Sequence, residues 1–157
     1  MLYNPNFDLL IHGLDVLSSQ VDELCLVDNS SCDCRSKLPE QKKIHYIPLK
    51  KNMGIAAAQN IGLQALMSHG MDYVLLSDQD SVAQADVVVN LKWALDTLSN
   101  EGISVGGVGT RAINLQTKRP YRSKSKEYIS VELSDKNKSV TVTEVSYIRA
   151  SITLAKL

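Results

Sequence analysis

YVLLSDQDS, residues 73–81, is the stretch that decides the fold class. Its first four residues are apolar without polar alternation, which is typical of a parallel strand covered on both faces. Residues 24–27, which precede Asp28, and residues 44–48 have the same character. Three short buried strands at these intervals favour a mainly parallel, Rossmann-like sheet.

Helical patterns lie between the predicted strands. Apolar residues recur at three- and four-residue spacing over residues 7–21 and again over residues 87–98. Residues 55–67 are apolar almost all round and rich in alanine, so we expect that helix to be buried and closely packed on the sheet. Helix and strand alternate, which predicts the α/β class with right-handed crossovers.

The composition limits the function classes. The 157 residues fit one domain, and 17 acidic residues balance 17 basic ones, which argues against a nucleic-acid binder. No apolar run approaches the roughly 20 residues that span a bilayer, and no signal peptide opens the chain. Three cysteines argue against a disulfide framework and predict a cytoplasmic protein.

Polar clusters follow the predicted strands. In an open α/β sheet, ligands bind beyond the carboxyl ends of the strands. The clusters are residues 28–31, residues 52–54 with Asn60, and residues 78–81.

Asp78 and Asp80 lie two residues apart just after a strand. In an extended or turning segment this spacing points both carboxylates to one side, where they can share a hard divalent cation. Such a cation neutralises the charge of a departing sugar diphosphate. The alternative is that Asp80 or Ser81 only caps the following helix.

Gly54 precedes the helix over residues 55–67, and a helix N-terminus with glycine suits an anion. A plain strand-to-helix turn is the alternative. Asn60 has apolar neighbours, so its amide is expected to need a backbone or ligand partner. The side chain of Asp28 is suited to binding the edge of a base or ribose, although the composition of residues 28–31 is also typical of a turn.

Other chemistry-bearing residues give weaker signals. Cys32 and Cys34 have the wrong spacing for a zinc site and predict a surface loop. His12, His45 and His69 are scattered through different elements and form no visible ligand set. Residues 118–126 form a basic loop. One interpretation is a solvated surface, and the other is a surface that attracts an anionic lipid-linked acceptor or a membrane face.

Taken in order, these segments resemble the bacterial rhamnosyltransferases of the inverting GT-A glycosyltransferase family. The matching segments are Tyr3-Asn4-Pro5, Val27-Asp28-Asn29, residues 51–62 and residues 76–81. The more specific matches are Gly-Ile-Ala-x-Ala-Gln-Asn-x-Gly, residues 54–62, and Asp-Gln-Asp-Ser, residues 78–81. The resemblance covers residues 1–115 well and is loose afterwards.

The resemblance implies an incomplete GT-A fold, with a nucleotide-sugar-binding core over residues 1–115 and the start of an acceptor-side region over residues 116–157. The implied nucleotide-sugar-binding residues are Tyr3, Asn4, Asp28, Asn29, Asn52, Gly54, Asn60 and Asp78. Asp28 would contact the base and Asp78 would face the ribose. Asp80, together with Asp78, would hold the Mg²⁺ or Mn²⁺ that bridges the diphosphate.

The implied reaction moves a sugar, rhamnose, from a dTDP-sugar to a surface-polysaccharide acceptor on a lipid carrier. The protein would then be cytoplasmic, with peripheral contact at the inner face of the membrane. Two alternatives stay open. One is a catalytically inactive nucleotide-sugar-binding remnant or scaffold, and the other is an unrelated doubly wound nucleotide binder whose Asp78 and Asp80 only cap a helix.

The chain departs from the family at both ends and is therefore expected to be truncated. Family members begin with a full apolar strand where this chain has Met1 and Leu2. The expected strand order 3-2-1-4 puts that strand in the centre, so either another segment fills its place or exposed edges favour marginal stability and self-association. No general base can be named, although Glu127, Glu132 and Glu144 are present.

Overall fold

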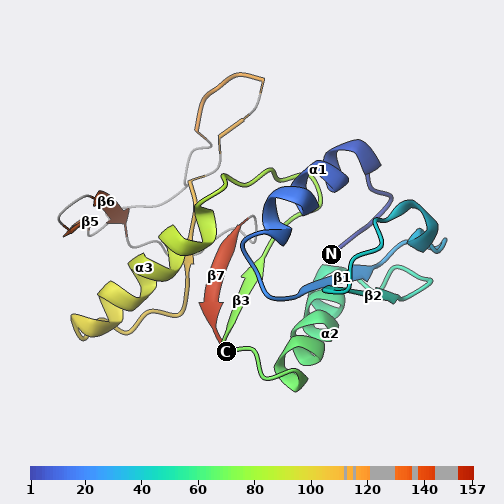
Figure 1. The fold of residues 1–157 in the computed structure, drawn as a ribbon, viewed down its shortest axis with the longest axis horizontal. Helices are drawn as coiled ribbons and strands as arrows, with labels where there is room; N and C mark the ends of the chain where they lie inside the picture. The colour runs from blue at the N-terminus through green and yellow to red at the C-terminus, as the bar shows by residue number, and fades with distance from the viewer. Residues whose placement is uncertain (112, 115, 121–129, 136–137, 144–151) are drawn as a thin grey trace.

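The computed structural model describes residues 1–111, 113–114, 116–120, 130–135, 138–143 and 152–157. Helices and strands alternate over the first hundred residues, as predicted for the α/β class (Figure 1). The helices are α1 (Phe7–Ser18), the short 3₁₀ turn η1 (Arg35–Lys37), α2 (Ile55–Ser68) and α3 (Val87–Asn100). The strands are β1 (Leu24–Asp28), β2 (Ile44–Pro48), β3 (Tyr73–Leu76), β4 (Val108–Gly109), β5 (Ser130–Asp135), β6 (Lys138–Thr143) and β7 (Thr153–Lys156).

The described strands form three small sheets. β1 and β2 are parallel, with Leu24 opposite Ile44. β7 lies between β3 and β4 and is antiparallel to both. β5 and β6 form an antiparallel hairpin, which the alternating pattern of residues 128–133 and 139–147 predicts. Parallel pairing is therefore narrower than the sequence pattern suggested: among described residues it comprises β1 with β2 and one bridge between Leu2 and Asp28.

α1 and α3 follow their predicted apolar stripes. The side chain of Asn6 caps α1 by accepting a hydrogen bond from the N–H of Leu9, at 3.2 Å. Leu10, Leu14 and Leu17 of α1 are buried. In α3 the buried residues are Val87, Leu91, Ala94, Leu95 and Leu98.

The prediction that α2 is buried all round is wrong. Its buried residues are Ala58 and Gly62, whereas Ile55 and Met67 are 54% and 57% exposed. The two small residues lie four apart on the face toward β1, where a Cβ added to Gly62 would lie 3.0 Å from Cγ2 of Val27. Small residues are therefore needed where α2 packs closely against β1, and the opposite face of α2 is exposed to solvent.

Two apolar clusters form the core. The first joins α3 to β4 and β7 and includes Leu133 of β5, which docks the hairpin onto the body of the protein. The second joins Leu2 and α1 to β1, β2 and Cys34. None of the described helices is both long and apolar enough to cross a bilayer.

A cavity of about 360 Å³ separates β1 from β3, and we call it the slot. Its walls include residues 24–27 and 73–77 together with residues of α1 and α2. At one end the N–H of Leu2 donates to the carbonyl of Val27, and the N–H of Asn29 donates to the carbonyl of Leu2, both at 2.8 Å. In the described part of the chain, no strand pairs with the edges of β1 and β3 along the rest of the slot.

Replacing Gly62 with valine is expected to destabilise the protein by about 1–3 kcal/mol, because the added methyl groups would overlap Val27. The free energy of unfolding in urea measures the effect. Gln64→Val is the control, because Gln64 is exposed on the same helix and reports the helix propensity of valine alone. Equal stability of both variants would contradict the close packing of α2 on β1.

Candidate functional site

The carboxylate of Asp28 is buried at the carboxyl end of β1, with 1% of the residue exposed. Its Oδ1 accepts from the N–H of Ser30 at 3.0 Å. Its Oδ2 accepts from the hydroxyl of Tyr46 at 2.5 Å and from Sγ of Cys34 at 2.9 Å. A direct contact of Asp28 with a base therefore stays a prediction, and it would require these bonds to rearrange.

The hydrogen bonds set the protonation state of this cluster. Burial alone would raise the pKa of Asp28, but the bonds from Cys34, Tyr46 and Ser30 outweigh it, and the pKa lies below its ordinary value. Burial and the Asp28 carboxylate raise the pKa of the Cys34 thiol to about 11. The same causes raise the pKa of Tyr46. Asp28 is consequently an ionised acceptor held by neutral donors.

Asn29 ties the end of β1 to the loop before α2. Its Nδ2 donates to Oδ1 of Asn52 at 2.9 Å, and its Oδ1 accepts from the N–H of Met53 at 2.8 Å. Oδ1 of Asn52 also accepts from the N–H of Gly54 at 2.9 Å. Three predicted site residues, Asn29, Asn52 and Gly54, are thus in one hydrogen-bonded group.

The N-terminal segment joins this group to the Asp-Gln-Asp turn. The backbone N–H of Asn4 donates to Oγ of Ser30 at 2.9 Å. The amide of Gln79 binds both backbone groups of Tyr3, accepting from its N–H at 2.7 Å and donating to its carbonyl at 3.0 Å. Gln79 and Ser30 were missed as site residues, although both belong to motifs that the sequence singled out.

Asp78 and Asp80 lie in a turn after β3, in which the N–H of Ser81 donates to the carbonyl of Asp78 at 3.3 Å. Asp78 is half-buried and Asp80 is exposed. α3 begins only at Val87, so neither Asp80 nor Ser81 caps it. The alternative in which the acidic pair caps this helix is therefore wrong. That the two carboxylates share a cation stays a prediction.

The N-terminus of α2 is open at Gly54. This glycine has a φ of 85°, a region that favours glycine, and no side chain caps the helix. No heavy atom lies within 4 Å of a Cβ built there. The N-terminus of α2 therefore has open space at Gly54 beside the hydrogen-bonded loops, and a helix N-terminus suits an anion.

Asn60 departs from its expected environment. It is exposed, because it lies on the face of α2 opposite Ala58, and an exposed amide needs no protein partner. Among the described residues, no hydrogen bond joins it to the other site residues, so its role in nucleotide-sugar binding stays a prediction.

Two further expectations from the sequence are wrong. Cys32 is exposed, as predicted for a surface loop, but Cys34 is buried, because its thiol donates a hydrogen bond to the buried carboxylate of Asp28. His45 and His69 are not scattered in space, because β2 and α2 bring them together beside Glu23 although they are far apart in the sequence. Of the basic loop, residues 121–126 lie outside the described residues, as do Glu127 and Glu144, and Glu132 is described only as part of β5.

Residues 3–152 match the model of the family described as Glycosyl transferase family 2. The chain belongs to this family. Over 106 residues it is 32% identical to "dTDP-rhamnosyl transferase RfbF" from Shigella flexneri, an alignment that covers 67% of this chain and 35% of that protein. The chain thus spans about a third of the length of this curated relative.

Family membership confirms the predicted GT-A, rhamnosyltransferase-like class and its α/β fold. β7, from the end of the chain, pairs with β3 and β4, so the two regions predicted on either side of residue 115 share one sheet. The division into a donor core and an acceptor-side region stays a prediction.

Tyr46→Phe removes a donor to the buried Asp28 carboxylate and is expected to lower the free energy of unfolding by about 1.5–3 kcal/mol at neutral pH. The folded pKa of Asp28 is depressed, so the ionised carboxylate stabilises the fold above its unfolded pKa of about 3.9. This stabilisation is lost as the pH falls through the folded pKa, and the difference from wild type should shrink there.

Urea unfolding of both proteins at a series of pH values measures this. Tyr73→Phe is the matched control, because its hydroxyl donates to Asp96 at the longer distance of 3.2 Å at the surface. A deficit in Tyr46→Phe that does not depend on pH would contradict the role given to Asp28.

Proposed function

We propose that this chain binds the nucleotide-diphosphate sugar donor of a rhamnosyltransferase, dTDP-rhamnose, at the carboxyl ends of β1, β2 and β3. The observation that carries the proposal is the continuous hydrogen-bonded path from Gln79 through the N-terminal segment and Ser30 to Asn52. It links the loops that follow all three strands, the position where open α/β sheets bind ligands. The name of the Shigella relative, which specifies a dTDP-rhamnosyl donor, supports the choice of sugar nucleotide.

The diphosphate would lie between the N-terminus of α2 and the acidic turn. Backbone N–H groups after Gly54 would bind phosphate oxygens. Exposed Asp80, with Asp78, would hold Mg²⁺ or Mn²⁺ against the same phosphates, because hard cations prefer carboxylate oxygens. The metal would neutralise charge on the leaving nucleotide diphosphate.

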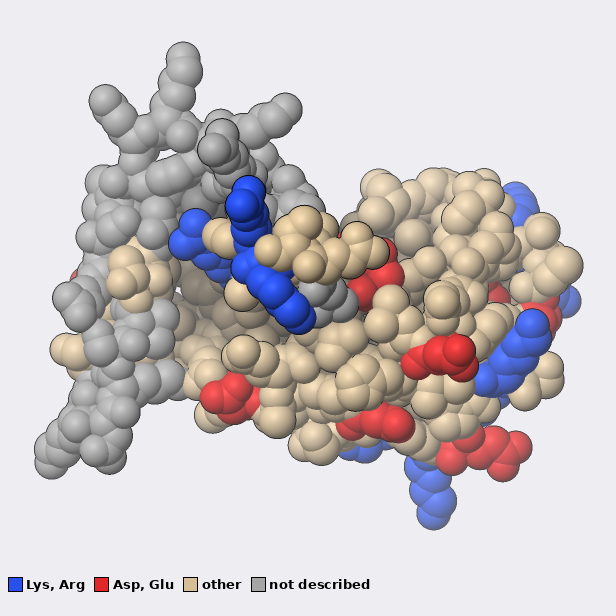
Figure 2. Space-filling model, turned by 90° about the horizontal axis from the view of Figure 1, so that it is seen from above, with Lys and Arg blue, Asp and Glu red and all other residues tan. Residues whose placement is uncertain are grey.

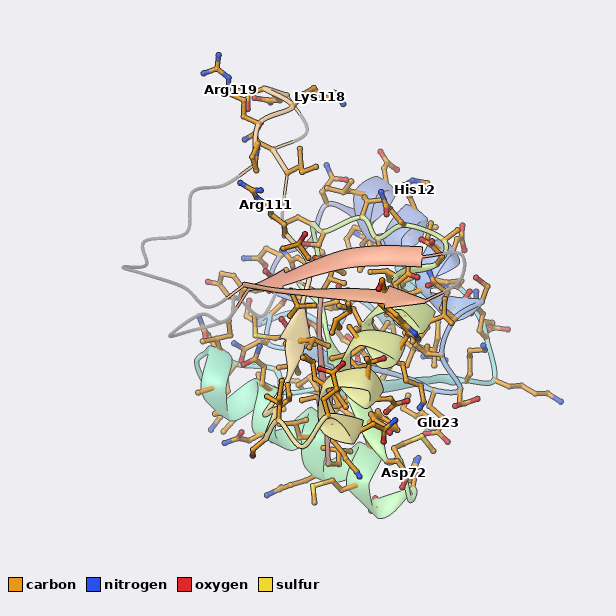
Figure 3. The ribbon with its side chains drawn as sticks, turned by 90° about the vertical axis from the view of Figure 1, so that its left-hand side faces the viewer. His12, Glu23, Asp72, Arg111, Lys118 and Arg119 are labelled. Carbon is orange, nitrogen blue, oxygen red and sulfur yellow. The ribbon has the colours of Figure 1, made fainter. Side chains whose placement is uncertain are left out.

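A lipid-linked oligosaccharide acceptor, belonging to surface-polysaccharide synthesis, would approach from the basic end of the protein. Arg111, Lys118 and Arg119 are exposed and lie at one end of the molecule (Figure 3). Figure 2, which views that end from above, shows Lys and Arg side chains gathered on one part of this face. Cationic side chains attract anionic lipid headgroups, which supports a cytoplasmic protein in peripheral contact with the inner membrane face.

A donor-binding remnant or scaffold without turnover is the second candidate. It is favoured by one observation: among the described carboxylates, none is placed as a general base. Inverting transfer needs a base to deprotonate the acceptor hydroxyl. Both candidates share the donor site and differ only in transfer.

Titration calorimetry with dTDP, with and without Mn²⁺, tests donor binding. Binding is expected to require Mn²⁺, and Asp80→Asn should lower the affinity at least about tenfold, or 1.4 kcal/mol. Asp72→Asn is the matched control, since Asp72 is exposed and precedes β3 at its other end (Figure 3). Equal affinity of the Asp80 variant would contradict the metal site.

Transfer of radiolabelled rhamnose to a lipid-linked acceptor then separates the two candidates. Turnover by the wild-type chain, lost in Asp80→Asn, supports the enzyme. Metal-dependent binding of dTDP without turnover supports the remnant.

We also propose that the slot drives self-association. The backbone hydrogen-bonding groups of Leu24 and Asp28 point toward β2. Because these groups point to opposite sides in successive residues of a strand, those of Cys25 and Val27 point toward the slot. Leu2 satisfies the carbonyl of Val27, and a strand from a second copy would pair with the remaining groups.

Sedimentation velocity over a wide concentration range measures this association. The weight-average sedimentation coefficient is expected to rise with concentration, and the melting temperature should rise with it, because pairing binds the folded state. A monodisperse monomer with one cooperative, concentration-independent melting transition would contradict the proposal.

A further inference from the structure

A second cluster of metal-ligating side chains lies away from the candidate donor site. Glu23 immediately precedes β1, His45 lies in β2, and His69 is the residue that ends α2. Nε2 of His45 lies 3.1 Å from Oε2 of Glu23, and Nδ1 of His69 lies 2.6 Å from the same oxygen. One ligand atom from each residue lies within 4.8 Å of the other two.

Two imidazoles and one carboxylate are donors that suit zinc. Zn²⁺ bonds of about 2.0–2.1 Å in a tetrahedron place neighbouring ligand atoms about 3.3 Å apart. The two separations to Glu23, 3.1 Å and 2.6 Å, are both shorter than that spacing. Side-chain rotations that lengthen them by about 0.2–0.7 Å would admit the ion. Three protein ligands would leave a fourth position for water.

The surroundings also favour a cation. His69 ends the 14-residue helix α2, where the helix dipole presents its negative end. The side chains of Glu23, His45 and His69 are 25%, 38% and 39% exposed, which leaves the ligand atoms open to an ion from solvent.

The two histidine rings lie close to each other as well as to Glu23. The rings of His45 and His69 meet edge to face with centroids 4.8 Å apart, and both direct a nitrogen at one carboxylate oxygen. Each imidazole would supply a nitrogen lone pair to a divalent ion.

We propose that Glu23, His45 and His69 form a binding site for a divalent transition metal, with Zn²⁺ as its preferred ion. The site is distinct from the donor site: Glu23 precedes β1 and Asp28 ends it, so the length of the strand, about 16 Å, separates them. Figure 3 shows Glu23 at the end of the molecule opposite Arg111 and Lys118.

Titration of the full chain with Zn²⁺ alone tests the proposal. We expect one Zn²⁺ per chain, with affinity lowered at least tenfold in His45→Gln, in His69→Gln and in Glu23→Gln. His12→Gln is the matched control, because His12 is an exposed histidine in α1, far from Glu23 in Figure 3, and it should bind as wild type does. Asp80→Asn should also keep full zinc binding, which separates this site from the donor metal.

Co²⁺ provides a second measurement that does not depend on the folding of any variant. Four-coordinate Co²⁺ in the wild-type chain is expected to give intense visible d–d bands, which stoichiometric Zn²⁺ abolishes. Absence of saturable Zn²⁺ binding, weak six-coordinate Co²⁺ bands, or unchanged affinity in the His45→Gln/His69→Gln double variant would overturn the proposal. Loss of zinc binding in Asp80→Asn would also overturn it.

Discussion

The buried carboxylate of Asp28 is the constraint on which the candidate donor site depends. A charge removed from water at the end of a strand must be hydrogen-bonded, and its donors come from Ser30, Cys34 and Tyr46. These donors fix the loop after β1, and the hydroxyl of Ser30 then receives the N–H of Asn4. Asp28 therefore acts on the site through the loops it positions, which explains how a residue with almost no exposure can organise a ligand-binding surface.

The candidate donor site also lies where hydrogen bonds join the two main sheets. Gln79 bonds Tyr3 beside the acidic turn, and α1 packs so closely on that turn that a Cβ at Gly13 would lie 3.2 Å from the carbonyl of Ser81. Farther along, the slot separates β1 from β3. A bound nucleotide and its metal would add contacts between the two sheets at the end where Gln79 bonds Tyr3. Any ligand that binds only the folded state raises its stability.

The apolar runs predicted β1, β2 and β3 and the residues that follow them, because strand period and strand ends are local properties of a sequence. Pairing is not local, so the antiparallel partner of β3, residues 153–156, could not be predicted from the pattern. The same limit hid the contact between His45 and His69, which are 24 residues apart and meet only when α2 packs beside β2. Burial of Cys34 was missed because its hydrogen-bond partner, Asp28, and most of its neighbours in the second apolar cluster come from other segments of the chain.

The direction of α2 accounts for both proposed sites. A helix that follows one parallel strand places its N-terminus at the carboxyl edge of the sheet and its C-terminus at the opposite edge. Gly54 accordingly opens the positive end of the helix dipole toward a diphosphate, while His69 stands at the negative end and suits a cation. A 14-residue helix is about 21 Å long, more than two Debye lengths at physiological salt, so the charges of the two sites interact weakly. Communication between them would have to proceed through movement of α2 against β1, which the contact of Gly62 with Val27 restricts.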